Sequence, residues 1–249
     1  MAGNTILITG AGTGIGRALA EAFYSEGNQL IITGRRMHKL DEVVAAHPGM
    51  VAYELDMLDR DAIREFGRMI TIQHPQLNVV VNNAGVMIQE DLTLGDSSLD
   101  QVDTMLETNF SGLVRLNAAF IQHLLTMSKA TIINVGSGLA HVPLAAVPTY
   151  CATKAAIHSY TQSLRHQMRD KCIEVLEIIP PAVHTGLLGS DLPAPHEMRL
   201  ADFIAEVMSL LRKQPPQQEI CVGNVMPLRH AEAGDYAAMF SQVNKGIVL

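Results

Sequence analysis

TILITGAGTGIG, residues 5–16, is the stretch of sequence that decides the fold. Residues 5–9 are apolar and β-rich, which predicts a short buried strand. Glycines follow at positions 10, 12, 14 and 16, and Ile15, Leu19 and Phe23 then recur at helical spacing. The predicted order is therefore a strand, a glycine-rich turn and a helix.

This order of elements is typical of an anion-binding site. Glycines allow the turn to adopt positive φ and let a pyrophosphate approach the backbone closely. The amino end of the following helix offers N–H groups and its dipole to the anion. A glycine-rich stretch is often only a loop, but its place between the first strand and the first helix favours nucleotide binding.

Strands and helices alternate along the rest of the chain. Apolar runs predict strands at residues 5–9, 29–33, 51–55, 78–82, 130–135, 174–179 and 219–223. Helical spacing predicts helices near residues 15–26, 38–46, 59–73, 99–127, 151–169, 200–212 and 231–243. Repeated βα units with nearly continuous apolar strands indicate a parallel sheet that is covered on both faces. We therefore expect an α/β fold, a Rossmann-type doubly wound parallel sheet of about seven strands, with ligands at the carboxyl ends of the strands.

The composition favours one domain over residues 1–249. The chain is 48% hydrophobic, and no linker, repeat or charge block interrupts it. Its net charge of −7 argues against a nucleic-acid or anionic-membrane partner. No apolar run approaches the ~18 residues of a membrane span, and no signal peptide precedes the strand at Thr5. Three cysteines without metal spacing fit a reducing compartment, so we expect a cytoplasmic protein without a bound metal.

Tyr150 and Lys154 lie four residues apart and, on a helix, project from one face. A phenol titrates near pH ~10, and a nearby ammonium favours the phenolate and lowers that pKa. A pKa near 7 requires about three units, or roughly 4 kcal/mol, which one lysine rarely supplies. A cationic cofactor ring beside the phenol could supply the rest. Without further context, an ordinary exposed helix turn is the better explanation of the pair.

Five motifs occur along the chain in a fixed order. They are Thr9-Gly10 with Gly14 and Gly16, Asn82-Asn83-Ala84-Gly85, Asn109, Ser137 thirteen residues before Tyr150, and Tyr150 with Lys154. In this order they resemble the short-chain dehydrogenase/reductase family over nearly the whole chain. Residues 150–160 and 164–170 are most similar to a bacterial subgroup labelled DltE-like, a label that settles no substrate.

The end of the second predicted strand distinguishes between the two nicotinamide cofactors. Many NAD-binding domains carry an acidic residue there, which binds the ribose 2′-hydroxyl. This chain has Gly34 in that position, followed by Arg35 and Arg36, and a guanidinium can hold a 2′-phosphate through several N–H donors. We expect NADP(H), with Arg35 as the main contact and Thr13 in support. The alternatives are NAD(H), or arginines that only face water.

The resemblance implies a mechanism and a set of cofactor contacts. Ser137 and Tyr150 would bind the substrate oxygen, Tyr150 would be the general acid/base, and Lys154 would lower its pKa and hold the nicotinamide ribose. Asn109 would hold a water that links Lys154 to solvent, or would only bond to backbone inside a helix. Asp56 would contact the adenine, or cap the helix near residue 59. The cofactor-binding set is Gly10, Thr13, Gly14, Ile15, Gly16, Arg35, Arg36, Asp56, Met57, Asn83, Ala84, Gly85, Tyr150, Lys154, Pro180, Val183 and Thr185.

The substrate would be a small carbonyl compound or its alcohol. We expect residues 138–143, the segment after Gly85, and residues 186–200 to form its pocket. Residues 186–200 are either a mobile lid or an ordinary surface loop. The mostly apolar rim favours a hydrophobic or aromatic carbonyl over a phosphorylated sugar. His141 and His184 are either structural or substrate-binding, and Cys151 is expected only to pack.

Besides a cell-wall role in D-alanylation, which rests only on the label of the subgroup, two rival functions remain. One is a non-enzymatic NADP(H)-binding sensor or scaffold, which the intact Ser137, Tyr150 and Lys154 set disfavours. The other is a sugar-nucleotide epimerase or dehydratase, for whose larger substrate domain 249 residues leave little room. The resemblance also implies a homodimer through the helices near 99–127 and 151–169, with a homotetramer as the alternative.

Overall fold

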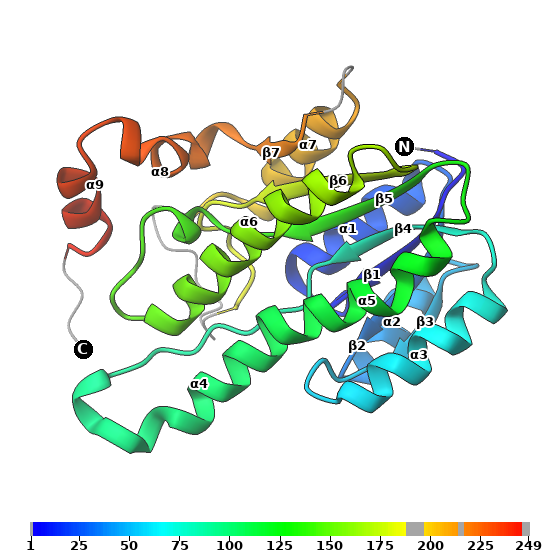
Figure 1. The fold of residues 1–249 in the computed structure, drawn as a ribbon, viewed down its shortest axis with the longest axis horizontal. Coiled ribbons are helices and arrows are strands. Elements are labelled where there is room, and N and C mark those ends of the chain that lie inside the picture. The colour runs from blue at the N-terminus through cyan, green and yellow to red at the C-terminus, as the bar shows by residue number, and fades with distance from the viewer. Residues whose placement is uncertain (1, 188–196, 214–216, 246–249) are drawn as a thin grey trace.

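One sheet of seven parallel strands organises the protein (Figure 1). The computed structural model describes residues 2–187, 197–213 and 217–245. Across the sheet the strand order is β3-β2-β1-β4-β5-β6-β7, and every neighbouring pair is parallel. The strands are β1 (Thr5–Thr9), β2 (Gln29–Gly34), β3 (Val51–Glu54), β4 (Leu77–Asn82), β5 (Ala130–Val135), β6 (Ile173–Ile179) and β7 (Glu219–Cys221). The predicted parallel α/β sheet is confirmed.

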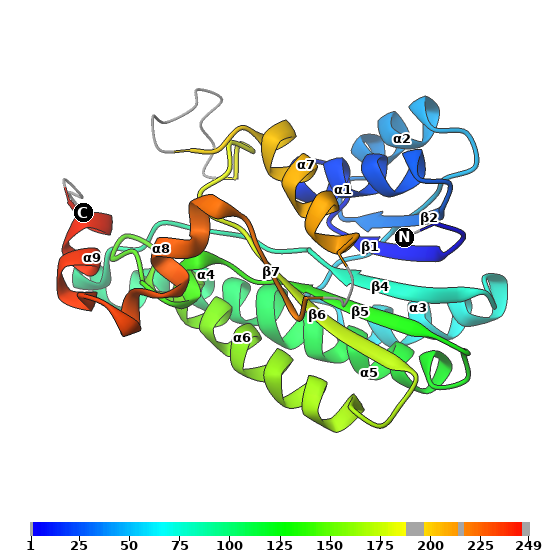
Figure 2. The same ribbon diagram turned by 90° about the horizontal axis from the view of Figure 1, so that it is seen from above.

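Helices cover both faces of this sheet (Figure 2). They are α1 (Gly14–Ser25), α2 (Met37–Ala46), α3 (Arg60–Gln73), α4 (Leu99–Met105), α5 (Gly112–Leu124), α6 (Pro148–Met168), α7 (Leu200–Leu211), α8 (Met226–Arg229) and α9 (Tyr236–Val243). One face packs against α1, α2 and α7, and the other against α3, α5 and α6. Ile6 and Ile8 of β1 point to the first layer and Leu7 to the second, because side chains alternate along a strand.

The strand order reverses direction at β1. The chain moves outward from β1 to β2 and β3, and β4 then returns to the other side of β1. The connections that leave β1 and β4 therefore diverge and open a crevice at the carboxyl ends of the strands, where doubly wound sheets bind ligands. The glycine-rich turn and the Asn83–Gly85 segment both leave the sheet at this point.

Two predicted helices differ from the structure. The helix expected at residues 231–243 is broken, because Gly234 has φ −119° and ψ −146°, and α9 begins only after Asp235, which caps it by accepting a hydrogen bond from Ala238 N. The helix expected at residues 99–127 contains a π-helical turn at Leu106–Ser111, which carries Asn109. The other helices begin and end within three residues of the predicted ranges.

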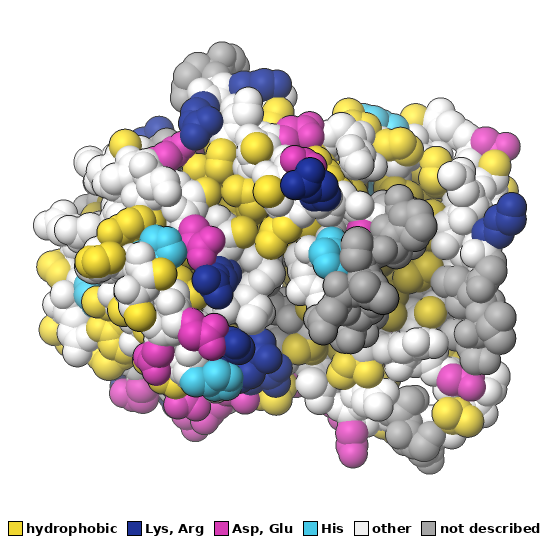
Figure 3. Space-filling model, turned by 180° about the vertical axis from the view of Figure 1, so that it is seen from behind, with side chains coloured by type: hydrophobic (Ala, Val, Ile, Leu, Met, Phe, Trp, Pro, Cys, Tyr) yellow, Lys and Arg dark blue, Asp and Glu magenta, His cyan; other side chains and the backbone are white. Residues whose placement is uncertain are grey.

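The face shown in Figure 3 carries charges of both signs, with Lys and Arg side chains lying among Asp and Glu side chains. Among the described residues, no helix is long and apolar enough to cross a membrane.

Candidate active site

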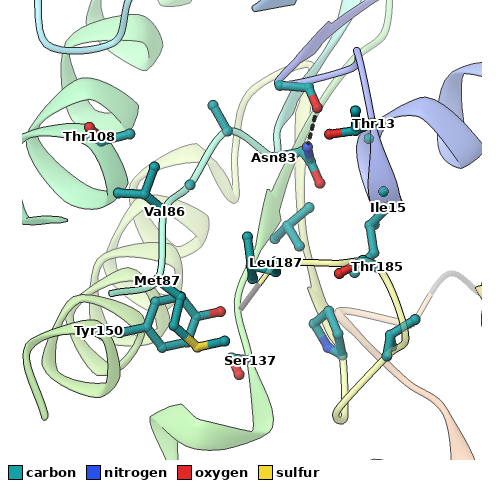
Figure 4. A pocket seen from close by; sticks show the side chains of 18 of the residues that line it. Thr13, Ile15, Asn83, Val86, Met87, Thr108, Ser137, Tyr150, Thr185 and Leu187 are labelled. Atoms are coloured by element: carbon teal, nitrogen blue, oxygen red, sulfur yellow. Dashed lines mark hydrogen bonds between the residues drawn. The ribbon is translucent and has the colours of Figure 1, made fainter. Parts of the chain in front are cut away.

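One cavity of about 990 Å³ lies at the carboxyl ends of the strands. It brings together nearly all the residues predicted from the sequence. Those that line it are Gly10, Thr13, Gly14, Ile15, Gly16, Arg35, Arg36, Asp56, Met57, Asn83, Ala84, Gly85, Ser137, Tyr150, Lys154, Pro180, Val183 and Thr185. Asn109 lies behind this wall. Side chains from both ends of the cavity appear in Figure 4.

The glycine-rich turn forms the floor of one end of the cavity. Gly10 and Gly14 have φ values of 66° and 57°, which favour glycine. A Cβ on Gly10 would lie 2.8 Å from Ala84 Cα, and one on Gly16 would lie 2.4 Å from the Gly10 carbonyl oxygen. Two of these glycines are therefore required by the packing of the chain on itself, in addition to any ligand.

The amino end of α1 faces the cavity without an ordinary cap. Thr13 precedes the helix in extended geometry, but its side chain makes no capping hydrogen bond. Its hydroxyl instead lies 3.4 Å from Nη2 of Arg36. A helix amino end with glycine-lined space in front of it and two guanidiniums beside it suits the phosphates of a dinucleotide.

Asn83 joins the glycine-rich turn to the end of β4. Its side-chain amide donates to the carbonyl oxygens of Thr9 (2.9 Å) and Gly10 (3.2 Å), and its backbone N–H donates to the Thr9 hydroxyl. Figure 4 shows the Asn83 side chain with a hydrogen bond from its amide. Asn83 therefore holds the glycine-rich turn against the end of β4, and it also lines the cavity.

Arg35 and Arg36 are exposed at the rim of the same end of the cavity. Arg36 is also the N-cap residue of α2. Asp56 lines the cavity, and its carboxylate accepts a hydrogen bond from Leu58 N. The alternative role of Asp56 as a helix cap is wrong, because Asp59 caps α3 by accepting from Asp61 N and Ala62 N.

Ser137, Tyr150 and Lys154 meet at the other end of the cavity. Tyr150 and Lys154 lie one turn apart on α6, and Ser137 follows β5. Ser137 and Tyr150 are each 8% exposed and Lys154 is 4% exposed. The Lys154 ammonium donates to the Val135 carbonyl oxygen at 2.8 Å and lies 5.5 Å from the centre of the Tyr150 ring. The Ser137 hydroxyl accepts from Leu139 N at 3.1 Å.

Burial dominates the protonation of this pair. It raises the pKa of Tyr150 far above its ordinary value of 10, although the Ser137 side chain opposes the shift. Burial also lowers the pKa of Lys154 to about 8. In the chain by itself the pKa of Tyr150 is therefore raised and not lowered, and the effect of Lys154 on this pKa stays a prediction. The lysine lies over the face of the ring and bonds to backbone, so desolvation of the phenol outweighs it.

Asn109 bonds to backbone, but across elements and not within its own helix. Its amide accepts from Val86 N (2.8 Å) and donates to Val86 O (2.9 Å) and to the Thr153 hydroxyl (3.2 Å). Asn109 therefore fixes the segment after Gly85 against α6. Its proposed water relay stays a prediction.

Apolar side chains surround Tyr150. Met105, Val147, Tyr150 and Cys151 form a buried cluster, against which Val86, Met87, Ile88, Leu139 and Leu144 pack. Figure 4 shows Met87 beside the Tyr150 ring. The expected rim contributes Leu139, the segment after Gly85, Gly186, Leu187 and Glu197 to the cavity wall, and Leu144, one residue beyond the expected range 138–143, also lines it. Most of the expected lid, residues 188–196, lies outside the described residues.

The sequence did not predict that the C-terminal segment forms part of this wall. Leu228 of α8 and Val243 of α9 both line the cavity. Asn244 fastens the segment to the loop before α6: its side chain accepts from Ala145 N at 2.6 Å and donates to Pro143 O at 3.0 Å.

Three other predicted residues can now be placed. His184 lies 3.2 Å from the Glu197 carboxylate through its Nδ1 atom. His141 has a buried Nε2 without a hydrogen-bond partner among the described residues, and neither histidine lines the cavity. Cys151 is a buried free cysteine that contacts the backbone of Leu144, which fits the expected packing role.

Known proteins resemble this chain in sequence and in fold. A family model described as short chain dehydrogenase matches residues 4–194. An uncharacterized oxidoreductase, DltE of Bacillus subtilis, is 38% identical over 248 residues, 98% of each chain. NADPH-dependent 1-acyldihydroxyacetone phosphate reductase of Schizosaccharomyces pombe is 34% identical over 189 residues, which cover 75% of this chain and 62% of that protein. A solved short-chain dehydrogenase from Burkholderia cenocepacia, in complex with NADP, is similar with a TM-score of 0.83 at 22% identity, over 97% of this chain and 98% of the other.

Proposed function

This chain belongs to the short-chain dehydrogenase family, and we propose from that premise that it is an NADP(H)-dependent oxidoreductase that interconverts a carbonyl compound and its alcohol. The observation that carries the proposal is that Ser137, Tyr150 and Lys154 line the same cavity as the glycine-rich turn. A nucleotide bound on that turn and a substrate beside Tyr150 would share one enclosed space.

The described residues fit an NADP(H) molecule. The uncapped amino end of α1 suits a pyrophosphate, and Arg35 and Arg36 border the end of β2, where a 2′-phosphate is read in related folds. The Burkholderia structure that shares this fold holds NADP, which supports the choice of cofactor.

Tyr150 would move the proton. A bound nicotinamide supplies or accepts the hydride at the carbonyl carbon. As the carbonyl oxygen gains negative charge, the Tyr150 hydroxyl donates its proton to that oxygen, and Ser137 donates a hydrogen bond that stabilises it. In the reverse direction Tyr150 takes the proton from the alcohol. Lys154 places positive charge beside the Tyr150 ring and so favours the ionised phenol.

The wall around Tyr150 favours an uncharged, apolar substrate. Val86, Met87, Leu139, Leu144, Leu228 and Val243 line this end of the cavity. Among the described lining residues, the cations other than Lys154 are Arg35, Arg36 and Lys39, which belong to the nucleotide end. The yeast relative is named for an acylated phosphate ester. Here the described wall suits an acyl or aromatic group and places no cation to hold a substrate phosphate.

The test measures NADPH oxidation over a panel of aldehydes, ketones and quinones. Tyr150→Phe should lower kcat by about 10²–10⁴-fold, because it removes the general acid, while the Kd for NADPH changes little. Tyr160→Phe is the matched control: Tyr160 lies on the same helix, outside the residues that line the cavity.

Three outcomes are informative. Turnover by the wild type that Tyr150→Phe abolishes supports the proposal. Near-normal turnover by Tyr150→Phe would refute the assignment of the acid/base. A wild type that binds NADPH tightly and reduces nothing in the panel would favour the non-enzymatic binding protein.

The homodimer and the cytoplasmic location stay predictions. In the single chain, α4 exposes Leu99 and the turn after it exposes Leu106, which provides apolar surface on the helices expected at the dimer contact.

A further inference from the structure

A carboxylate is buried in the middle of an apolar strand close to the catalytic residues. Glu177 lies between Leu176 and Ile178 on β6 and is 0% exposed. Burying a carboxylate is costly unless charges or hydrogen bonds compensate for it. Its partners therefore show what this side chain does.

The two carboxylate oxygens of Glu177 have different surroundings. Oε2 lies 2.8 Å from Nδ1 of His158, which is on α6. Oε1 is inaccessible to solvent and has no hydrogen-bond partner among the described residues. It faces Gly136, where an added Cβ would lie only 2.4 Å away, and Gly136 lines the cavity next to Ser137.

Lys154 reaches the same peptide segment from α6. His158 and Lys154 lie one turn apart on one face of α6. The Lys154 ammonium donates to the carbonyl oxygen of Val135, the residue before Gly136. The ammonium contacts Val135 and the free oxygen of Glu177 faces Gly136, so both groups lie against one peptide segment.

The other cations near Glu177 already have partners. Arg229 donates to both oxygens of Glu219, at 2.7 Å and 3.1 Å. Arg165 donates to the carbonyl oxygens of Val175 and Gln218. Among the described residues, the titratable groups that interact with Glu177 or with the groups around it are Lys154, His158 and Arg165 from α6, His141 from the loop before it, Glu219 and Cys221 from β7, and Arg229 and His230 at the end of α8. Lys154 and His158 are therefore left to balance Glu177.

We propose that Glu177 is the charge partner of Lys154: His158 holds its carboxylate against Gly136, and the carboxylate keeps the catalytic lysine in its ammonium form. Glu177 is a positioning residue that acts through Lys154 and touches no substrate. The role of that ammonium in turnover rests on the function proposed above, but the charge pairing itself does not.

The electrostatics agree with this geometry. Burial lowers the pKa of Lys154 to about 8, and Glu177 acts in the opposite direction by raising it. Hydrogen bonding to Glu177 likewise raises the pKa of His158. Lys154 loses its charge as the pH rises through its pKa, so removal of the carboxylate should move that loss to lower pH.

The direct test is an NMR titration of Lys154. The chain has six lysines, so ¹³Cε-labelled lysine gives few signals, and the signal missing in Lys154→Met identifies Lys154. In Glu177→Gln the pKa of Lys154 should fall by about one unit or more relative to the wild type. Glu174→Gln is the matched control, since it makes the same change on the same strand at a partly exposed position, and it should leave the pKa in place.

A folded Glu177→Gln protein in which Lys154 titrates as in the wild type would overturn the proposal, and so would an equal shift in Glu174→Gln. If Glu177→Gln does not fold, Glu177→Met provides the same test, because an apolar side chain of similar volume suits this strand. The titration needs no substrate, so it stands even if no carbonyl is reduced. With a competent substrate, the alkaline decline of kcat/KM should begin at lower pH in Glu177→Gln than in the wild type. At pH values above both pKa values, kcat/KM of the variant should be at least about tenfold lower than that of the wild type.

Discussion

Replacing Arg35 with alanine should weaken the binding of NADPH and leave the binding of NADH nearly unchanged. Arg35 is exposed and lines the nucleotide end of the cavity, beside the end of β2. Only NADPH carries a 2′-phosphate for its guanidinium to hold. A hydrogen bond between charged groups contributes about 1.5–3 kcal/mol. Since Arg35 is exposed, the lower end of that range applies. About 1.4 kcal/mol corresponds to a tenfold change in Kd, so Arg35→Ala should raise the Kd for NADPH about tenfold.

Arg36 should share this role. It is the N-cap residue of α2, and its Nη2 atom lies 3.4 Å from the Thr13 hydroxyl oxygen, beside the amino end of α1. Arg36→Ala should therefore also weaken NADPH binding, by roughly tenfold, and the double variant should lose most of the preference for NADPH over NADH. The preference should decline as salt is raised, because exposed charges are screened.

The assay is a fluorescence titration of each protein with NADPH and with NADH, at low and at high salt. Arg64→Ala is the control, because Arg64 is an exposed arginine on α3 that pairs with Asp61 outside the cavity. A wild type that binds NADH as tightly as NADPH, together with an Arg35→Ala variant that binds both as the wild type does, would refute the reasoning.

Two further predictions concern the rest of the molecule. Asn244→Ala removes the hydrogen bonds to Pro143 and Ala145. KM for an apolar carbonyl should therefore rise by up to about tenfold, with little change in the Kd for NADPH. The control is Asn224→Ala, which replaces an exposed asparagine and should change neither KM nor Kd. Burial lowers the pKa of His141 to about 4. Its neutral form therefore stabilises the fold fully above its ordinary pKa of about 6.5, and this contribution is lost as the pH falls toward 4. Urea unfolding across this pH range should show that the free energy of unfolding falls by up to about 2 kcal/mol, a figure discounted for the partial exposure of His141. In His141→Gln this decrease should be smaller. A decrease as large as in the wild type would contradict the assignment.

The nucleotide end of the cavity could be predicted from the sequence because its residues follow strand ends directly. Gly10 comes immediately after β1, Gly14 begins the helix that follows, and Asn83 comes immediately after β4. In a doubly wound sheet these ends must converge, so a correct strand assignment also places the motifs. The reason for Gly16 could not be predicted in this way, because its close contact with the Gly10 carbonyl depends on how the turn folds back.

The substrate end could not be predicted as fully, because its contacts join distant parts of the chain. Asn244 bonds to Pro143, 101 residues earlier. The helical pattern at residues 231–243 predicts one helix, but Gly234 and Asp235 interrupt it. The helix that begins after this interruption ends at Val243, which lines the cavity. No local pattern records a contact of this kind.

A signal for Glu177 was present in the sequence. β6 was predicted to be a buried, nearly continuous apolar strand, and Glu177 is a charged residue in the middle of it. Carboxylates are almost never fully buried unless they are paired, and unusual burial of titratable groups is concentrated at functional sites. Glu177 pairs with His158, which lies four residues after Lys154. On a helix this spacing places His158 and Lys154 on the same face, so the sequence also pointed to a connection between Glu177 and Lys154.

The protonation of Tyr150 also bears on the direction of the proposed reaction. Burial raises its pKa, so the chain by itself holds the phenol protonated at neutral pH. A protonated phenol is ready to donate to the oxygen of a carbonyl that is being reduced. Oxidation of an alcohol requires a phenolate, and hence more positive charge than Lys154 provides from its place over the ring. In the proposed function, the described residues by themselves therefore hold Tyr150 in the form that donates a proton, and the further positive charge that oxidation requires would have to come from a bound nicotinamide ring.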